Sequence, residues 1–278
     1  MAVIDSHHHV WQVARRPHQW PPEARATLDR DFTPTDLLKE MRAAGVDGTI
    51  LMQSLNDYEE TEEFLDIAQA TPWMRGVVGW VPLDNPAETE AALDLLSARG
   101  PLVGIRHLMR VGATPGFLQR PDVVQSLTLV ARAGLAFETV PTNPEQWEQA
   151  FATADRFPDM PCVVNHLGRP PVPESGWEPW ATWITRAAAR ENMVIKLSAG
   201  IALIQHWRWS TAQIRPFVEH VIESFGPERV MAGSNWPVVL IAGTYQEVWR
   251  GIVELLAPYA ESERAAMLGG NAERVYGL

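Results

Sequence analysis

The stretch VIDSHHHVWQ, residues 3–12, joins the apolar start of a buried strand to three consecutive histidines. Side chains two positions apart on a strand point to the same side, so His7 and His9 share one face and His8 takes the other. If this strand belongs to a barrel, we expect His7 and His9 to face the barrel axis and His8 to face the surrounding helices. The fold therefore decides whether the two histidines meet other polar groups.

Seven later segments have the same apolar, β-branched character, which is typical of strands buried on both faces in a parallel sheet. The eight predicted strands are VIDSHHH (3–9), GTILMQ (48–53), GVVGWVP (76–82), LVGIRH (102–107), LAFETV (135–140), CVVNHLG (162–168), MVIKLSA (193–199) and RVMAGSNWP (229–237).

Helical patterns separate these strands. The predicted helices span 33–45, 85–100, 143–157, 175–191 and 244–259. The first three begin with a Thr or Asn cap followed by proline, and the first two end at glycine. Alternating strands and helices predict a single (β/α)8 TIM barrel over residues 1–278. A doubly wound open sheet is the alternative, and the count of eight strands favours the closed barrel.

The segment 12–30 follows the first predicted strand and is rich in proline. It shows no regular pattern, so it is predicted to be irregular. Because it leaves the carboxyl end of a strand, we expect it to lie over the barrel mouth as a lid or wall.

Composition narrows the class of protein. The formal net charge of −11 disfavours nucleic acid and anionic membranes as partners. No apolar run reaches the length of a membrane span, and the polar N-terminus does not resemble a signal peptide. The only cysteine, Cys162, excludes an intrachain disulfide and is expected to pack in a strand. We expect a cytoplasmic protein that acts on a small molecule, and a homo-oligomer is compatible with the sequence.

Polar residues gather where the predicted strands end. Active sites of (β/α)8 barrels lie at these carboxyl ends, and a polar group inside a buried strand is costly unless it is paired. A ring of such residues therefore predicts one shared site. Besides the histidines of the first strand, its members are Gln53, Arg106, His107, Glu138, Asn165, His166, Lys196, Ser198, Ser234, Asn235 and Trp236.

Several of these residues have a structural alternative. His7 and His9 are predicted to bind a metal or a substrate oxygen, although a solvated strand end also accommodates them. His166 is either a site residue or a satisfied core histidine. Arg106 forms either an ion pair or a bidentate clamp for a carboxylate, and the clamp is favoured.

The same choice applies to three further positions. Glu138 and Lys196 either contact substrate or pair with each other. Trp236 either contacts substrate or packs. No nucleophile elbow, P-loop or dinucleotide fingerprint is present.

Together these motifs resemble the amidohydrolase superfamily, and most closely its branch of sugar-acid lactonases and 2-pyrone-4,6-dicarboxylate lactonase. The likeness covers essentially the whole chain. The motifs that carry it are D-x-H-x-H-x-W (Asp5 to Trp11), LDRDFTPTDL (28–37), GIRH (Gly104 to His107), NHLGRP (Asn165 to Pro170), KLSAG (Lys196 to Gly200), GSNWPV (Gly233 to Val238) and the terminal GGNAERVYGL.

The resemblance implies a (β/α)8 hydrolase that opens small lactones bearing carboxylates. In that reading, His7 and His9 polarise the lactone carbonyl, directly or through one divalent metal such as zinc, and His166 holds the same oxygen. Arg106 binds a substrate carboxylate. Further contacts with substrate are predicted for Gln53, His107, Glu138, Lys196 and Trp236.

Residue 235 departs from the family pattern. Many relatives have Asp in G-S-D-W-P, where it acts as general base, and this chain has Asn235. Asparagine has no useful basicity, so we expect it to orient water or bind substrate. Asn165 likewise stands where Asp is frequent. Two histidines without a carboxylate form an incomplete zinc site, so no cofactor is expected.

Several readings stay open at this stage. Glu138 or one of the histidines is the base, or the reaction is an isomerisation that needs less of a base. Alternatively, the chain is a metal-dependent amidohydrolase or decarboxylase, or it is a non-catalytic binder of an acidic sugar.

Overall fold

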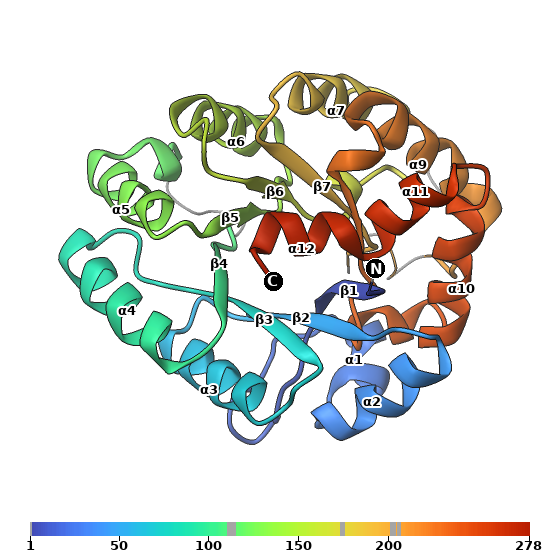
Figure 1. The fold of residues 1–278 in the computed structure, drawn as a ribbon, viewed down its shortest axis with the longest axis horizontal. Coiled ribbons are helices and arrows are strands. Elements are labelled where there is room, and N and C mark those ends of the chain that lie inside the picture. The colour runs from blue at the N-terminus through green and yellow to red at the C-terminus, as the bar shows by residue number, and fades with distance from the viewer. Residues whose placement is uncertain (1, 110–114, 173–175, 201–203, 205–206) are drawn as a thin grey trace.

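Eight parallel strands form a barrel in chain order, β1 to β8, and helices surround it (Figure 1). The computed structural model describes residues 2–109, 115–172, 176–200, 204 and 207–278. The architecture confirms the predicted (β/α)8 barrel and excludes an open doubly wound sheet. The strands are β1 (Ile4–His8), β2 (Gly48–Met52), β3 (Met74–Gly79), β4 (Leu102–Arg106), β5 (Ala136–Thr139), β6 (Cys162–Val164), β7 (Met193–Leu197) and β8 (Val230–Ala232).

The helices pack outside the strands and include all five that the sequence predicts. The helix predicted from residue 175 begins later, at Trp180, and residue 175 lies outside the described part of the chain. The helices are α1 (Pro22–Leu28), α2 (Pro34–Ala43), α3 (Tyr58–Gln69), α4 (Pro86–Arg99), α5 (Pro121–Arg132), α6 (Pro144–Arg156), α7 (Trp180–Ala188), α9 (Thr211–Phe225), α10 (Tyr245–Leu256), α11 (Glu261–Ala265) and α12 (Asn271–Tyr276).

The predicted helix caps are present. The side chain of Thr33 accepts a hydrogen bond from the backbone of Asp36, and Asn85 and Asn143 cap α4 and α6 in the same way. A cap satisfies a backbone N–H that the first turn leaves without a partner. The Thr-Pro and Asn-Pro pairs therefore fix where these helices begin.

Three predicted boundaries are wrong. The segment 12–30 is not irregular throughout, because it contains α1. The predicted strands 162–168 and 229–237 both end early. Each runs into residues with left-handed backbone, His166 (φ 58°) and Leu167 (φ 51°) after β6 and Asn235 (φ 57°) after β8. Such φ values are incompatible with a continuing strand.

Barrel closure between β1 and β8 relies little on backbone pairing. The two segments share the isolated parallel bridge between His8 and Trp236. Two backbone hydrogen bonds accompany it, from His9 N to the Trp236 carbonyl at 2.7 Å and from Asn235 N to the His7 carbonyl at 2.8 Å. Both bonds involve residues of the predicted site, so closure and site geometry are linked.

The carboxylate of Asp5 adds side-chain hydrogen bonds to this contact between β1 and the segment after β8, and these bonds are called the Asp5 seam. It accepts hydrogen bonds from His7 N (3.1 Å), Ser234 N (2.8 Å), Ser234 Oγ (2.6 Å) and Tyr245 Oη (3.2 Å). The side chain is fully buried, and burial raises the pKa of Asp5 to about 6 despite these four donors. One carboxylate thus ties β1 to the segment after β8 and to α10.

At the opposite end, α12 lies across the region where the strands begin (Figure 1). Its Tyr276 hydroxyl donates to the carboxylate of Glu138 inside the barrel. That carboxylate also binds the ammonium of Lys196, at 2.8 and 3.0 Å, and the side-chain amide of Asn165 at 3.0 Å. Glu138 and Lys196 have no exposed surface, so they form a satisfied buried ion pair, as the structural alternative predicts.

Two expectations from composition can be compared with the structure. Cys162 is a buried free thiol whose pKa burial raises to about 12, so it packs and is not reactive. Within the described part of the chain, no helix combines the length and apolar character that crossing a membrane requires.

The Asp5 seam yields a stability prediction. Asp5→Ala would leave four buried donors without an acceptor, so we expect it to lower the free energy of unfolding by about 3 kcal/mol or more. Tyr245→Phe removes one donor and should cost about 1 kcal/mol. Urea unfolding followed by circular dichroism measures both. Equal midpoints for wild type and Asp5→Ala would contradict the role of the seam.

Asp5→Asn should cost less than Asp5→Ala, because the amide keeps one acceptor and can donate to a hydroxyl oxygen. Since the pKa of Asp5 is raised on folding, the folded chain binds the proton more tightly than the unfolded chain. Wild-type stability from this group therefore falls as pH rises from about 4 to 6. Asp5→Asn is expected to lower the free energy of unfolding, relative to wild type, by more at pH 5 than at pH 7.5. An equal difference at both pH values would count against a titrating Asp5.

Candidate active site

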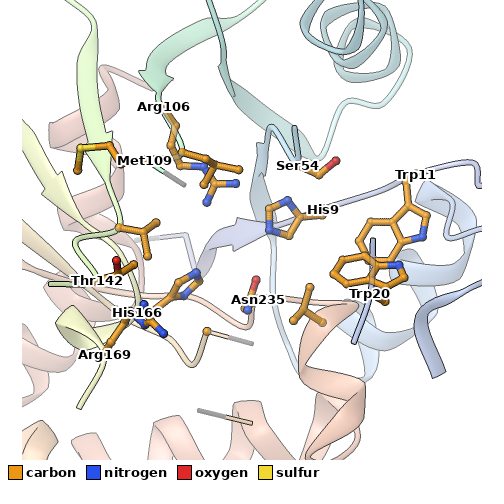
Figure 2. A pocket seen from close by; sticks show the side chains of 14 residues that line it. His9, Trp11, Trp20, Ser54, Arg106, Met109, Thr142, His166, Arg169 and Asn235 are labelled. Atoms are coloured by element: carbon orange, nitrogen blue, oxygen red, sulfur yellow. The ribbon is translucent and has the colours of Figure 1, made fainter. Parts of the chain in front are cut away.

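A cavity of about 350 Å³ opens at the carboxyl ends of the strands, a size typical of small-molecule sites. Figure 2 shows the side chains that surround it. They are contributed by the ends of nearly every strand and by the segment after β1. The lining residues are His9, Trp11, Trp20, Ser54, Arg106, Leu108, Met109, Val140, Thr142, His166, Arg169, Gly200, Asn235 and Val238.

Four predicted site residues line this cavity together. His9, Arg106, His166 and Asn235 point into it from the ends of β1, β4, β6 and β8 (Figure 2). Among the described residues, the lining contains two guanidinium groups and no carboxylate. Its polar part is therefore suited to an electron-rich oxygen or a negative charge.

The tautomer of His9 follows from its partner. His9 Nδ1 lies 2.9 Å from the carbonyl oxygen of Met52, which can only accept, so Nδ1 carries the hydrogen and Nε2 carries the lone pair. Burial, and then the charge of Arg106, hold the pKa of His9 well below its usual range. His9 is therefore a neutral imidazole at pH 7, and its basic nitrogen Nε2 lies 3.3 Å from His7 Nε2.

His7 lies beneath the cavity and is not among its lining residues. Its Nε2 is 3.3 Å from His9 Nε2 and 3.4 Å from a guanidinium nitrogen of Arg106, and its ring centroid is 4.6 Å from that of His166. Burial, and then the neighbouring His166 and Lys196, hold the pKa of His7 well below its usual range. His7 thus supports the two histidines that reach the cavity.

His8 turns away from this group, as the strand spacing predicts. Its Nε2 lies 2.9 Å from Thr49 Oγ1, and its ring faces Trp73 at 6.4 Å. Burial lowers the pKa of His8 to about 3, so it stays neutral. The His8 side chain packs on the face of β1 opposite to His7 and His9, and it does not line the cavity.

The imidazole of His166 occupies space that only a glycine leaves open. A Cβ atom on Gly200 would lie 2.9 Å from the ring carbon Cδ2 of His166. His166 Nδ1 is 2.9 Å from the hydroxyl of Ser198, which fixes the ring plane. Burial, and then Arg106 and Lys196, hold the pKa of His166 well below its usual range. This contact explains why residue 200, the last of the motif KLSAG, is a glycine.

Arg106 is held by the protein as well as facing the cavity. Its Nη2 donates to the backbone and side-chain oxygens of Gln53, and the Gln53 amide donates back to the Arg106 carbonyl at 3.0 Å. Burial lowers the pKa of Arg106 to about 10, which leaves it charged at pH 7. Gln53 therefore orients the arginine and does not line the cavity.

Asn235 presents an oxygen to the cavity. Its Nδ2 donates to the carbonyl of Ala199 at 2.7 Å, and its Oδ1 is buried without a partner. Its left-handed backbone places the side chain at the end of β8 where the family pattern has Asp. The side chain can accept a hydrogen from water or substrate but cannot keep a proton.

The structure places four other predicted contact residues away from the cavity. Glu138 and Lys196 form the interior ion pair described above. The ring of His107 stacks on Phe117 at 4.5 Å and accepts a hydrogen bond from Trp80 Nε1. Trp236 is buried edge-on against Phe32 at 5.3 Å. These four side chains have their printed partners within the protein and do not line the described cavity, which differs from the predicted contacts.

The segment 12–30 does contribute a wall, as predicted. Trp20 lies 5.1 Å from Trp11, and His18 stacks on Trp20 and lies 2.8 Å from Ser54 Oγ. Both tryptophans line the cavity (Figure 2). Trp11 belongs to the first motif, yet sequence reasoning assigned it no role, because an aromatic residue after a strand is equally typical of packing.

Arg169 is a second cavity-lining residue that the sequence prediction missed. It follows His166 within the motif NHLGRP and has left-handed backbone (φ 61°). Its side chain is half-buried, and burial lowers the pKa of Arg169. A partly desolvated arginine at the rim adds to the positive charge of Arg106. The remaining missed residues are apolar or small and carry no sequence signature.

The donor set was compared with the needs of a divalent metal. Catalytic zinc usually has three protein ligands. His7 and His9 offer two nitrogens 3.3 Å apart, but Arg106 lies 3.4 Å from His7 Nε2 and would repel a cation. In the described ranges no three His, Cys, Asp or Glu side chains group to hold a metal ion. The residues therefore do not fit a charge-balanced metal centre.

Comparisons with known proteins agree with this fold and these motifs. The family model described as Amidohydrolase matches residues 4–278. An L-fucono-1,5-lactonase from Burkholderia ambifaria is 33% identical and is aligned over 98% of this chain and 94% of its own length. A crystal structure of an amidohydrolase from Burkholderia multivorans with bound zinc has a TM-score of 0.90 at 27% identity, covering 100% of both chains.

A probable 2-pyrone-4,6-dicarboxylic acid hydrolase from Acinetobacter baumannii, solved with citric acid bound, has a TM-score of 0.78 at 18% identity and covers 100% of both chains, which shows the shared fold. The match of the family model over nearly the whole sequence, together with the lactonase relative, shows that this chain belongs to the amidohydrolase family.

Proposed function

We propose that this protein is a hydrolase that opens the ring of a sugar-acid lactone. The observation that carries the proposal is the group of His9, Arg106, His166 and Asn235 at the polar end of a cavity with aromatic and aliphatic walls. The 33% identical lactonase supports the same reaction class. We further propose a role in carbohydrate acid metabolism in the cytoplasm, which the lactonase name and the unpaired Cys162 support.

The chemistry assigns a task to each polar residue. Lactone hydrolysis places negative charge on the carbonyl oxygen in the transition state. Arg106 and His166 are placed to stabilise that oxygen, because both are held by fixed partners and need little reorganisation. The Oδ1 of Asn235 is placed to accept a hydrogen bond from the attacking water. Trp11 and Trp20 offer flat apolar surfaces for the C–H face of a sugar ring.

Substrates that carry a carboxylate are the finer part of the proposal. Arg106 and Arg169 supply two positive charges to the cavity, and the lining residues that the structure describes include no acid. Part of the Arg106 guanidinium is committed to Gln53, so Arg169 is the freer partner for an added carboxylate. A charge-assisted contact of this kind is stronger than a neutral hydrogen bond.

A substrate panel tests the reaction. L-Fucono-1,5-lactone, L-rhamnono-γ-lactone, an aldarolactone and 2-pyrone-4,6-dicarboxylate would each be followed with a pH indicator, since ring opening releases a proton. We expect turnover of at least one sugar-acid lactone well above the rate without enzyme. Absence of turnover with every member would overturn the proposed function.

Arg169→Met tests the preference for carboxylates. We expect KM for a carboxylated lactone to rise by about tenfold or more, because a charge-assisted contact is lost, while KM for a neutral lactone changes little. Methionine keeps an unbranched apolar stem in place of that of arginine, so most of the packing is preserved. An equal rise for both substrate classes would contradict a carboxylate contact at this position.

Metal dependence gives another prediction. Because Arg106 opposes a cation at the paired histidines, we expect a chelator to leave kcat unchanged and added zinc to bind weakly. Arg106→Met removes the opposing charge and should raise zinc affinity, measured by calorimetry without any activity assay. Inactivation of wild type by chelator with recovery on adding zinc would refute the metal-free reading.

A further inference from the structure

The reaction needs a proton acceptor, and residue 235 cannot supply it. Hydrolysis by water is slow unless a base removes a proton as the oxygen attacks. Among the cavity-lining residues that the structure describes, no side chain is a carboxylate, and the interior carboxylate of Glu138 is occupied by Lys196, Asn165 and Tyr276. Within that described lining, the imidazoles of His9 and His166 are the bases that remain.

The surroundings of residue 235 are built for an amide. Asn235 Nδ2 donates to the Ala199 carbonyl at 2.7 Å. A carboxylate in the same position would set two oxygens against each other at that distance, which is repulsive. The backbone at Ala199 thus requires a donor from residue 235, and the amide is oriented with Oδ1 toward the cavity. Asparagine here can accept a hydrogen bond through Oδ1 but leaves proton transfer to another group.

Of the two imidazoles, only His9 has a tautomer fixed by its partner. The Met52 carbonyl can only accept, so the lone pair of His9 lies on Nε2. The partner of His166 is the Ser198 hydroxyl, which can donate or accept. His166 can therefore present an N–H to the carbonyl oxygen, whereas His9 carries its lone pair on Nε2, which lies 3.3 Å from His7 Nε2.

We infer that His9 Nε2 is the general base of this site and that Asn235 positions the water it activates. The inference rests on the proposed lactone hydrolysis. Water gives one proton to His9 Nε2 as its oxygen bonds to the carbonyl carbon, and the carbonyl electron pair moves to the oxygen near Arg106 and His166. The electron pair on this oxygen then re-forms the carbonyl double bond, and the ring C–O bond breaks. The leaving ring oxygen takes the proton from His9. The product is the hydroxy acid.

The charges around His9 set the expected pH dependence. Arg106 faces it from β4, His7 and His8 flank it on β1, and His166 faces it from the end of β6. None of these groups is an acid, and burial with Arg106 lowers the pKa of His9. Its basic form is therefore complete at pH 7, and kcat/KM should fall only as pH drops below the ordinary histidine range near 6.5.

His9→Ala and His9→Gln test the base directly. We expect each to lower kcat by about 100-fold or more, the usual contribution of general base catalysis, with circular dichroism unchanged. Added imidazole should restore part of the rate of His9→Ala. His220→Gln, at the contact between α9 and α7, does not line the cavity and is the matched control with full activity. Retained activity in His9→Ala, or no recovery with imidazole, would overturn the inference.

Asn235→Asp is the second test of whether His9 or residue 235 acts as the base. We expect kcat/KM to fall by about tenfold, the value of one lost hydrogen bond, because the carboxylate opposes the Ala199 carbonyl. A rise in rate, with a new limb in the pH profile near a carboxylate pKa, would assign the base to residue 235 instead. If wild type hydrolyses lactones and these variants disagree, only the base assignment fails; if wild type hydrolyses none, the proposed function fails and the assignment falls with it.

Discussion

The buried carboxylate of Asp5 is the interaction on which the rest of this structure depends. The first and last strands meet through one backbone bridge, and no longer ladder of backbone hydrogen bonds joins the described residues there. Asp5 adds side-chain hydrogen bonds that join the two segments. It also receives the backbone N–H of His7, so the same atom group that closes the barrel sets the direction of β1 at the site. The amide N–H of Asn235 then bonds to the carbonyl of His7 and aligns the two sides of the cavity.

The alternating strands and helices, and the face on which each histidine lies, could be predicted because both follow from strict periodicities. A strand repeats every two residues, so the separation of His7 and His9 from His8 needed no tertiary information. The convergence of polar strand ends was predictable for the same reason. The cavity accordingly contains His9, Arg106, His166 and Asn235 from the predicted set.

The partners of these residues could not be predicted, because they depend on three-dimensional distances. Nothing local indicates that Gln53 orients Arg106, or that the strand before Asn235 stops early. Glu138 was predicted to contact substrate, yet its carboxylate lies inside the barrel, where it accepts a hydrogen bond from Tyr276, which is far along the chain. The cavity walls are apolar, and the sequence pattern alone does not distinguish an apolar residue in a cavity wall from one in the core.

Several buried polar atoms of the site have no hydrogen-bond partner among the residues that the structure describes. These atoms include His7 Nδ1, Arg106 Nε, Asn165 Oδ1 and Asn235 Oδ1. Such atoms are rare in folded proteins because each lowers stability, and they concentrate where bound molecules supply the missing hydrogen bonds. Together with the left-handed backbone of His166, Arg169 and Asn235, they mark the region where folding stability is given up for binding.

The hydrogen bond between Tyr276 and Glu138 joins residues 138 positions apart and has a consequence for synthesis on the ribosome. A nascent chain that has reached α10 contains every strand, yet its buried carboxylate still lacks the hydroxyl that α12 brings. The barrel can then assemble only provisionally, with the amino ends of its strands uncovered and their apolar interior open to water. Chaperones that shield unfinished barrels would therefore be needed longest at this end, opposite the cavity.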